Sequence, residues 1–198
     1  SPSLILYYPH GIICSGILTK LHFKENSNTV FAVAPILFYI PLLGWILHEC
    51  GCIPASYKMI DLALSKNISV IVVPDGVPGI VCMEDKTIWK YRYGIYNIAL
   101  KHNPDIFTIW CRNEFETYNV ISLPFIEERK WLSNKIGFAF IFPWVFGWCG
   151  TWMPNPVSLR FKTINMNLKE LSFQDRNSLR CSHLKQLQQL MNSHEHSE

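Results

Sequence analysis

The segment from Ile68 to Val73 constrains the fold most strongly, because five of its six residues are apolar and β-branched. A short continuous apolar run of this kind is typical of a strand that is buried on both faces, as in a parallel sheet. The run ends at Pro74 and Gly76, residue types that favour turns. The segment therefore predicts a central strand whose carboxyl end opens into a turn over residues 74–79.

Similar short runs recur along the chain and alternate with helical patterns. Strands are predicted near residues 4–7, 30–34 and 106–110, and helices over residues 12–24, 56–66 and 94–102. The alternation of strand and helix is the pattern of a parallel sheet with right-handed crossovers. We therefore predict an α/β fold, with a mostly parallel sheet flanked by helices, in a single domain of residues 1–192. Residues 193–198 are expected to form a disordered tail.

The last third of the chain carries weaker patterns. The charged run Glu127–Lys130 predicts a solvated helix face, and residues 157–164 alternate in polarity as a strand does. Ser172 and Asp175 resemble a capping box that precedes a final helix over about residues 173–192. The residues of that helix predicted to point inward are Leu184, Leu187 and Met191.

Two apolar stretches suggest contact with a membrane. The residues from Thr29 to Leu47 carry no charge, but Pro35 and Pro41 interrupt them, so a strand and a short apolar helix are favoured over a membrane span. That helix, expected over residues 41–50, either joins the core or dips into a membrane interface. Residues 136–152 are rich in Trp and Phe and predict a strand and an apolar loop. We expect peripheral or monotopic membrane association.

Charge and cysteine content exclude several classes of protein. A formal net charge of +3 is too small to indicate nucleic-acid binding, but it suits an anionic substrate or membrane surface. Seven cysteines, an odd number, indicate free thiols in a reducing compartment rather than a disulfide framework. His48, Cys50 and Cys52 have ligand-like spacing, but no second ligand pair follows, so no metal site is expected.

The chain begins at Ser1 with core-like residues, so we expect that an N-terminal membrane segment is missing.

The most reactive side chain at a predicted strand end is His10. It follows the apolar run Leu4–Leu6 on a sharp turn, and ligands of open α/β sheets bind at the carboxyl ends of strands. Histidine exchanges protons near neutral pH, so His10 is a candidate general base. The alternative is a turn histidine whose ring is satisfied by the backbone. Asp75, Glu114 and Glu116 follow other predicted strands and are candidate partners by location only.

Four separated motifs resemble those of one family. The residues Tyr8-Pro9-His10-Gly11 are similar to a His-Pro-His-Gly motif, and the segment from Gly51 to Asn67 is similar to the one after a central apolar helix. Residues 92–102 resemble an Arg-Lys-Gly-Phe helix, and residues 114–116 stand where a Gly-Glu-Asn-Glu motif is expected. These motifs, in this order over residues 4–165, resemble the diacylglycerol acyltransferase type-two family, which includes monoacylglycerol and wax-ester acyltransferases.

The sequence departs from that family's pattern at four places. Tyr8 replaces the first histidine of the motif, and Tyr93 replaces a lysine. The loop Pro74–Gly79 lacks the glutamate of a Gly-Gly-x-x-Glu motif. Related lysophospholipid acyltransferases have an aspartate five residues after the histidine, where this chain has Ser15. The group that orients His10 is therefore left open.

The resemblance implies an acyltransferase-like αβα sandwich that acts as an acyl-CoA-dependent O-acyltransferase. His10 would be the general base, with Glu114 and Asp75 as further catalytic candidates. Acyl-CoA would be the co-substrate, with no other cofactor, and Lys90 and Arg92 would bind its phosphates. The residues expected to bind substrate are Pro9, Gly11, Gly76, Lys90, Arg92 and Glu116.

The implied partners are acyl-CoA, a neutral lipid acceptor such as diacylglycerol or monoacylglycerol, and a membrane surface. The resemblance also places the protein at the endoplasmic reticulum, with its active site facing the cytosol, and is compatible with a homo-oligomer. Two alternatives stay open. One is a degenerate family member that binds lipid without catalysis, and the other is an acyltransferase for a long-chain alcohol or a lysophospholipid.

Overall fold

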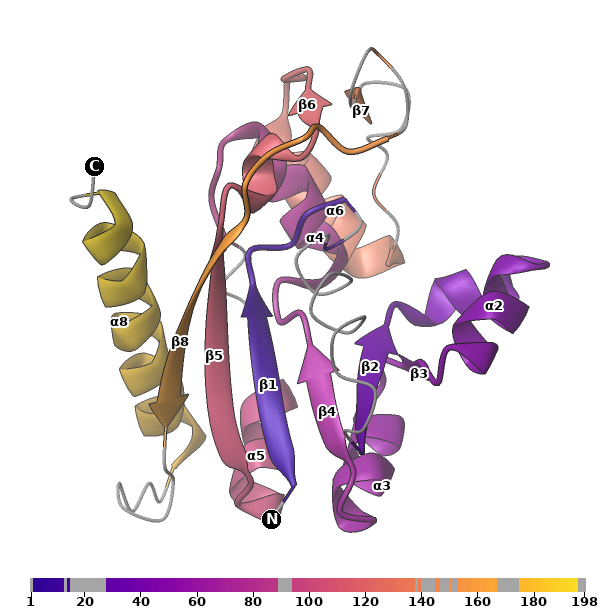
Figure 1. Cartoon of the computed structure of the whole chain (residues 1–198), viewed down its shortest axis with the longest axis vertical. Coiled ribbons are helices and arrows are strands. Elements are labelled where there is room, and N and C mark those ends of the chain that lie inside the picture. The colour runs from indigo at the N-terminus through magenta and orange to yellow at the C-terminus, as the bar shows by residue number, and fades with distance from the viewer. Residues whose placement is uncertain are drawn as a thin grey trace.

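A six-stranded sheet forms the centre of the computed structural model (Figure 1). The structure describes residues 2–12, 14, 28–88, 94–137, 139, 145–146, 150, 153–166 and 175–195. The strands are, in their order across the sheet, β3 (Ile53–Pro54), β2 (Thr29–Val33), β4 (Ser69–Val72), β1 (Ser3–Tyr8), β5 (Asp105–Arg112) and β8 (Arg160–Met166). All neighbouring pairs are parallel except β5 and β8. The predicted α/β fold with a mostly parallel sheet is confirmed.

The strand β1 lies in the middle of this sheet, paired with β4 on one side and β5 on the other. Leu6 is in register with Val72, and Tyr8 is in register with Trp110. Leu4, Leu6 and Val70 are at most 1% exposed. These three residues lie on one face of the sheet. On the other face Tyr7 and Ile71 are buried, whereas Ile5 is only half-buried. Burial on both faces, which the sequence predicts, therefore holds for Val70 to Val72 of β4 and only in part for β1.

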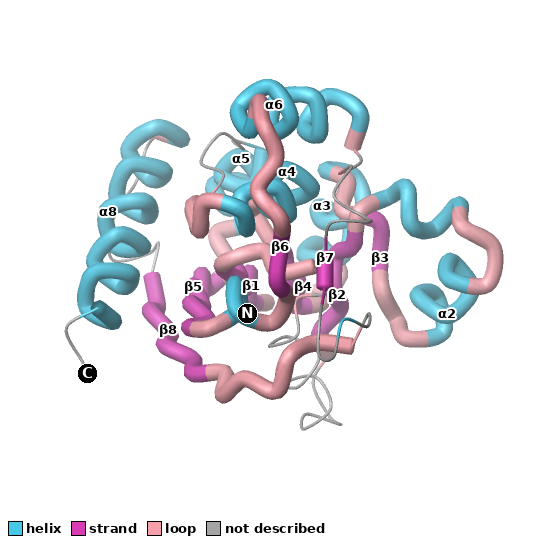
Figure 2. Tube along the Cα trace, turned by 90° about the horizontal axis from the view of Figure 1, so that it is seen from above, coloured by secondary structure: helices cyan, strands magenta, loops and turns pink. Residues whose placement is uncertain are grey.

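Three helices cover one face of the sheet (Figure 2). They are α3 (Tyr57–Ser65), α5 (Gly94–His102) and α8 (Arg176–Glu195). The hydroxyl of Ser56 caps α3 by accepting a hydrogen bond from the backbone amide of Met59. Ile60 and Leu64 are buried on the face that α3 turns toward the sheet. The helix predicted over residues 56–66 is therefore confirmed.

The C-terminal helix α8 begins after Asp175, whose carboxylate accepts a hydrogen bond of 3.1 Å from the backbone amide of Asn177. The helix continues to Glu195, three residues into the segment predicted to be a disordered tail. Leu187 is buried as predicted, whereas Leu184 and Met191 are only half-buried. The buried side chains of α8 are Leu179, His183, Leu187 and Leu190.

A second layer lies above the carboxyl ends of the parallel strands (Figure 1). It contains α4 (Gly76–Val81), the 3₁₀ turn η2 (Cys82–Glu84) and α6 (Ile126–Ile136). The prediction of a turn over residues 74–79 is correct only for its first part, because the helix α4 already begins at Gly76. The buried side chains of Val77 and Val81 pack in this layer and hold α4 over the strand ends.

The charged run on α6 is only partly the solvated helix face that the sequence predicts. Glu127 and Glu128 are exposed, but Lys130 is 4% exposed, and its ammonium bonds to Asp85 at 2.7 Å and Glu127 at 2.8 Å. Arg129 donates two hydrogen bonds to Glu84, one of them 2.6 Å long. The prediction fails for these two cations because Glu84 and Asp85, distant in the sequence, supply partners that allow them to leave the solvent.

The segment between β2 and β3 projects from the edge of the sheet (Figures 1 and 2). It comprises the 3₁₀ helix η1 (Pro35–Tyr39) and the helix α2 (Leu43–Glu49), and neither helix contains a buried residue. We call residues 35–49 the apolar arm. Tyr39 is 83%, Leu42 69% and Trp45 63% exposed. The helix expected over residues 41–50 is therefore present but does not join the core.

Some predicted elements fall outside the part of the chain that the structure describes. They are most of the helix over residues 12–24 and most of the aromatic segment 136–152. Within the latter, β7 (Val145–Phe146) pairs with β6 (Asn119–Val120) in a small antiparallel sheet. Among the described residues, no helix combines the length and the apolar character needed to cross a bilayer.

Candidate active site

Three neighbouring parallel strands deliver their following residues to one edge of the sheet. His10 follows β1, Asp75 follows β4 and Glu114 follows β5. The backbone amide of His10 donates a hydrogen bond of 3.3 Å to a carboxylate oxygen of Asp75. The prediction that His10 and the loop after β4 lie at the same sheet edge is therefore confirmed.

The imidazole of His10 is half-buried, and its Nδ1 contacts the backbone carbonyl of Gly11. A carbonyl oxygen only accepts hydrogen bonds, so this contact favours the tautomer with the proton on Nδ1. The lone pair then lies on Nε2, the nitrogen that is farther from the backbone. This is the state that a histidine needs in order to accept a proton from a substrate.

Asp75 holds the turn from the β4 side. Its side chain is fully buried, and Gly79 lies one helical turn further on, in α4. A Cβ atom at position 79 would lie 2.4 Å from the Cβ of Asp75 and 2.7 Å from the Cβ of His10. Any larger residue at position 79 would therefore have to displace Asp75 or His10. The loop after β4 is thus packed closely on the turn that carries His10.

Glu114 holds the turn from the β5 side. It is 0% exposed, and its carboxylate accepts a hydrogen bond of 2.6 Å from the hydroxyl of Tyr7. A Cβ atom at Gly11 would lie 2.4 Å from the other carboxylate oxygen, so the turn packs directly on this acid. Burial, followed by the nearby charge of Glu114, raises the pKa of Tyr7, so its hydroxyl remains a donor.

The thiol of Cys14 lies 3.7 Å from Nδ1 of His10, which raises the question of a Cys–His pair. Cysteine acts as a nucleophile only as the thiolate. Burial is the largest cause that raises the pKa of Cys14, and the charge of Glu114 raises it further. The thiol therefore stays protonated, and the geometry favours His10 as a base over Cys14 as a nucleophile.

The remaining predicted binding residues are placed as follows. Pro9 is buried between Tyr8 and His10, and Gly76 is the first residue of α4. Glu116 is exposed in the 3₁₀ turn η3 (Glu114–Glu116), where its backbone carbonyl accepts a hydrogen bond from Asn155. Lys90 and Arg92 lie outside the described residues.

Sequence reasoning missed three polar side chains behind the turn. Tyr96, Thr108 and His183 are all buried and are joined by hydrogen bonds. A signal was present at His183, because it lies four residues after Leu179 and four before Leu187, on the inward face of a helix. Its partners are 75 and 87 residues away in the sequence, so the pattern did not reveal them.

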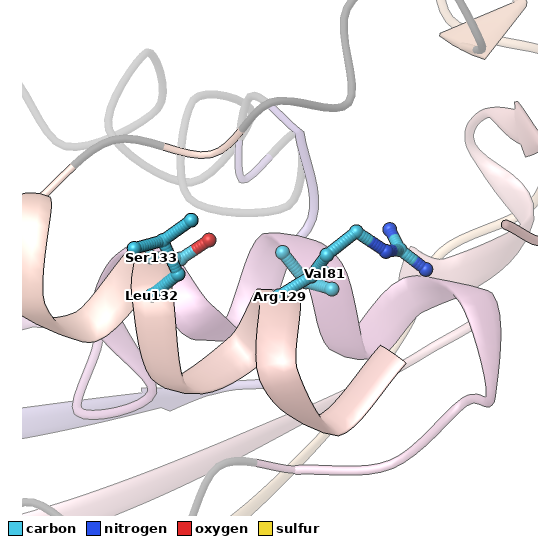
Figure 3. A pocket seen from close by; sticks show the side chains of 4 residues that line it. All are labelled: Val81, Arg129, Leu132 and Ser133. Carbon is cyan, nitrogen blue, oxygen red and sulfur yellow. The ribbon is translucent and has the colours of Figure 1, made fainter. Parts of the chain in front are cut away.

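Two hollows in the structure lie away from His10. A cavity of about 20 Å³ between α4 and α6 is lined by Val81, Arg129, Leu132 and Ser133 (Figure 3), and it has room for about one water molecule. A hollow of about 430 Å³ lies on α6 beside Trp131. Among the described residues no group of three or more His, Cys, Asp or Glu side chains is placed to hold a metal ion, so His48, Cys50 and Cys52 form no such site.

The fold is that of an acyltransferase. The 1-acyl-sn-glycerophosphate acyltransferase PlsC of Thermotoga maritima superimposes on the whole chain with a TM-score of 0.63, covering 68% of that protein at 13% sequence identity. This likeness in three dimensions confirms the acyltransferase-like sandwich that the resemblance of the sequence motifs implied. No family model matches the sequence.

Curated relatives identify the family that the sequence resembles. Diacylglycerol O-acyltransferase 2 of Danio rerio is 28% identical over 75% of the chain and 45% of its own length, and the Homo sapiens protein is 30% identical over 67% and 39%. The 2-acylglycerol O-acyltransferase 3 of Homo sapiens is 27% identical over 57% and 37%. The chain thus spans less than half the length of these relatives. They confirm the resemblance to the diacylglycerol acyltransferase type-two family.

Proposed function

We propose that this chain carries the catalytic part of a membrane-associated O-acyltransferase. It would move a fatty acyl group from acyl-CoA to the hydroxyl of a neutral lipid such as diacylglycerol or monoacylglycerol. The observation that carries the proposal is the contact between Nδ1 of His10 and the Gly11 carbonyl, which favours the tautomer in which Nε2 is the basic nitrogen. The relatives named as acylglycerol acyltransferases support the same reaction class.

In the first step, Nε2 of His10 accepts the proton of the acceptor hydroxyl as its oxygen attacks the thioester carbon of acyl-CoA. A tetrahedral intermediate forms, with its negative charge on the former carbonyl oxygen. Backbone amides after Gly11 are the natural donors to this oxyanion. The intermediate then collapses, the carbon–sulfur bond breaks, and the CoA thiolate takes the proton from His10. The products are the acylated lipid and free CoA.

Asp75 and Glu114 act in this mechanism by fixing the turn. Asp75 accepts the hydrogen bond from the backbone amide of His10, and Glu114 packs against Gly11. Both acids therefore contact the backbone of the turn rather than supply a second base. Lys90 and Arg92 bind the CoA phosphates in this proposal, and Glu116 remains a candidate for the acceptor side.

The apolar arm suits a lipid surface. Pro35 to Leu47 contains no charged residue, and Tyr39, Leu42 and Trp45 are mostly exposed. Aromatic side chains favour the interface between the hydrocarbon and water. We propose that the arm contacts the membrane of the endoplasmic reticulum from the cytosolic side, where it would give the site access to lipid acceptors.

A second candidate is a family member that binds lipid without catalysis. It is favoured by the loop Pro74–Gly79. This loop lacks the glutamate of the family, and it leaves no room for a side chain larger than that of Gly79 at position 79. An acyltransferase for a long-chain alcohol or a lysophospholipid is the remaining alternative, because the described residues around His10 are common to all these acceptors' chemistry, the transfer of an acyl group to a hydroxyl.

The test is transfer of a labelled acyl group from oleoyl-CoA to diacylglycerol, monoacylglycerol, hexadecanol or lysophosphatidic acid by the purified protein in detergent. We expect acylation of an acylglycerol, and a loss of about 10²- to 10⁴-fold in His10→Gln with an unchanged melting temperature. Unchanged turnover in folded His10→Gln would exclude His10 as the base. Absence of turnover in the unmodified protein, with oleoyl-CoA or lipid still bound, would establish the degenerate binder instead.

A further inference from the structure

The end of β1 is held from both faces of the sheet. Consecutive strand residues point to opposite faces, so Tyr7 and Tyr8 diverge just before the turn that carries His10. Tyr7 packs with Ile71 and Cys111 on one face and bonds to Glu114 there. Tyr8, which is 3% exposed, packs in the opposite cluster, beneath α5 and α8. The anchor on this second face has no role in the mechanism above.

A chain of buried polar side chains leads away from Tyr8. The nearby hydroxyl of Tyr96 in α5 is one of the causes that raise the pKa of Tyr8. The hydroxyl of Tyr96 lies 2.8 Å from Nδ1 of His183 in α8. Nε2 of His183 lies 2.9 Å from the hydroxyl of Thr108 in β5. The rings of Tyr8 and His183 are themselves in contact, with centroids 5.9 Å apart. The four residues therefore join β1, α5, α8 and β5.

Both hydrogen bonds of His183 can be satisfied at once. The hydroxyl of Tyr96 can donate its proton to Nδ1 of His183, which leaves the N–H on Nε2 to donate to the hydroxyl of Thr108. Each of the two bonds then has one donor and one acceptor.

His183 is neutral in this arrangement. It is 1% exposed, and burial lowers its pKa to about 4. Both ring nitrogens are engaged by protein hydroxyls, so the side chain works as a fixed link and not as a proton donor to substrate. A buried polar network in which every group is satisfied holds its members in one geometry.

We propose that His183 is a positioning residue for the catalytic turn: through its ring contact with Tyr8, and through Tyr96, it fixes Tyr8 and thereby holds His10 from the sheet face opposite to Glu114. This inference rests on the proposed function of His10. His183 thus supports the catalytic turn although it contributes no group to the reaction. Tyr8, which stands where the family motif has histidine, is the residue that receives this support.

The experiment compares His183→Phe, which keeps a ring but removes both hydrogen bonds, with His183→Gln, which retains an amide donor for Thr108. We expect kcat to fall about 10- to 100-fold in His183→Phe, with KM little changed and partial recovery in His183→Gln. Leu187→Val is the matched control, because it trims a buried side chain one turn further along the same helix face. The kcat of the folded control should stay within about twofold of the unmodified protein, since only packing is lost.

A readout without turnover separates this inference from the proposed function. The ring resonances of His10, assigned with His10→Gln, are recorded in each folded variant and in Tyr8→Phe, which removes only the hydroxyl at the other end of the chain. Shared displacement of the His10 resonances in His183→Phe and Tyr8→Phe, but not in Leu187→Val, supports the proposal even if the unmodified protein transfers no acyl group. Unchanged His10 resonances in folded His183→Phe, or an equal change in Leu187→Val, would overturn it.

Discussion

The carboxyl edge of the sheet and the apolar arm are both rich in tyrosine, tryptophan and aliphatic residues, but they use them in opposite ways. At the sheet edge, Tyr7 is 1% and Tyr8 3% exposed; the hydroxyl of Tyr7 donates to Glu114, and the ring of Tyr8 lies against that of His183. In the arm, Tyr39 is 83% and Trp45 63% exposed, and neither of its helices buries a residue.

The difference shows that apolar composition alone does not decide burial. Tyr7 and Tyr8 are buried because β1 is the central strand and because Glu114 and His183 reach them from other parts of the chain. The arm leaves the sheet at its edge, beyond β2, where the described helices α3, α5 and α8 do not cover it. We therefore expect changes at the sheet edge to lower stability and activity, and changes in the arm to lower lipid binding alone.

The largest expected effect on stability is a pH dependence that originates at the sheet edge. His183 has a pKa of about 4 in the folded protein, against 6.5 without burial, so between these pH values the unfolded chain binds a proton that the folded protein does not. The free energy of unfolding should therefore fall by about 3 kcal/mol as the pH decreases from 6.5 to 4. The neighbouring hydroxyls of Tyr8 and Tyr96 stay protonated in this range, because burial raises their pKa values.

Denaturant unfolding at several pH values measures this dependence. Carboxylates also titrate in this range, so the informative quantity is the difference between the unmodified protein and His183→Gln, in which the histidine is absent. A smaller decrease in His183→Gln is expected. Parallel curves for the two proteins would show that His183 is not buried in the neutral state.

A smaller effect on stability is expected for Gly79→Ala. The added methyl group would lie within 2.7 Å of the Cβ atoms of both Asp75 and His10, and these atoms move only with the backbone. We expect a loss of about 1–3 kcal/mol in the free energy of unfolding, together with a fall in acyl transfer because His10 is displaced. Gly94→Ala is the control, since nothing lies within 4 Å of the new Cβ at the start of α5. Equal activity of the two folded variants would contradict the close packing of α4 on the turn.

The smallest effect on stability is expected in the apolar arm. Leu42→Ser and Trp45→Ser should change the free energy of unfolding by less than about 0.5 kcal/mol, because both side chains are exposed. In a flotation assay, a smaller fraction of each variant than of the unmodified protein should bind to phosphatidylcholine vesicles. Leu62→Ser, which replaces an exposed leucine of α3, should bind as the unmodified protein does. Equal vesicle binding by all three variants would place the lipid contact elsewhere.

The sequence alone predicted the framework of the site but not its supports. The apolar runs at β1, β4 and β5 are local patterns, and the rule that parallel strands end at one sheet edge placed His10, Asp75 and Glu114 together. By contrast, the link from Tyr96 to His183 joins residues 87 positions apart, which no local pattern encodes.

The same limit explains two errors in the sequence prediction. Lys130 is buried on α6 because Asp85, 45 residues earlier, neutralises it, whereas its own neighbours in the sequence indicated a solvated face. Asp75 and Gly79 lie close together because α4 already begins at Gly76, whereas proline and glycine in this segment indicated a turn over residues 74–79. Both errors concern contacts that depend on which elements meet in space.

The central claim, that His10 is the general base, is tested most directly by the ¹⁵N chemical shifts of its two ring nitrogens in the protein labelled with ¹⁵N-histidine. The contact between Nδ1 and the Gly11 carbonyl predicts that neutral His10 carries its proton on Nδ1 and its lone pair on Nε2. His10→Gln identifies the two resonances by their absence. A neutral His10 with its proton on Nε2, where the acceptor hydroxyl would have to deliver its own proton, would contradict the account.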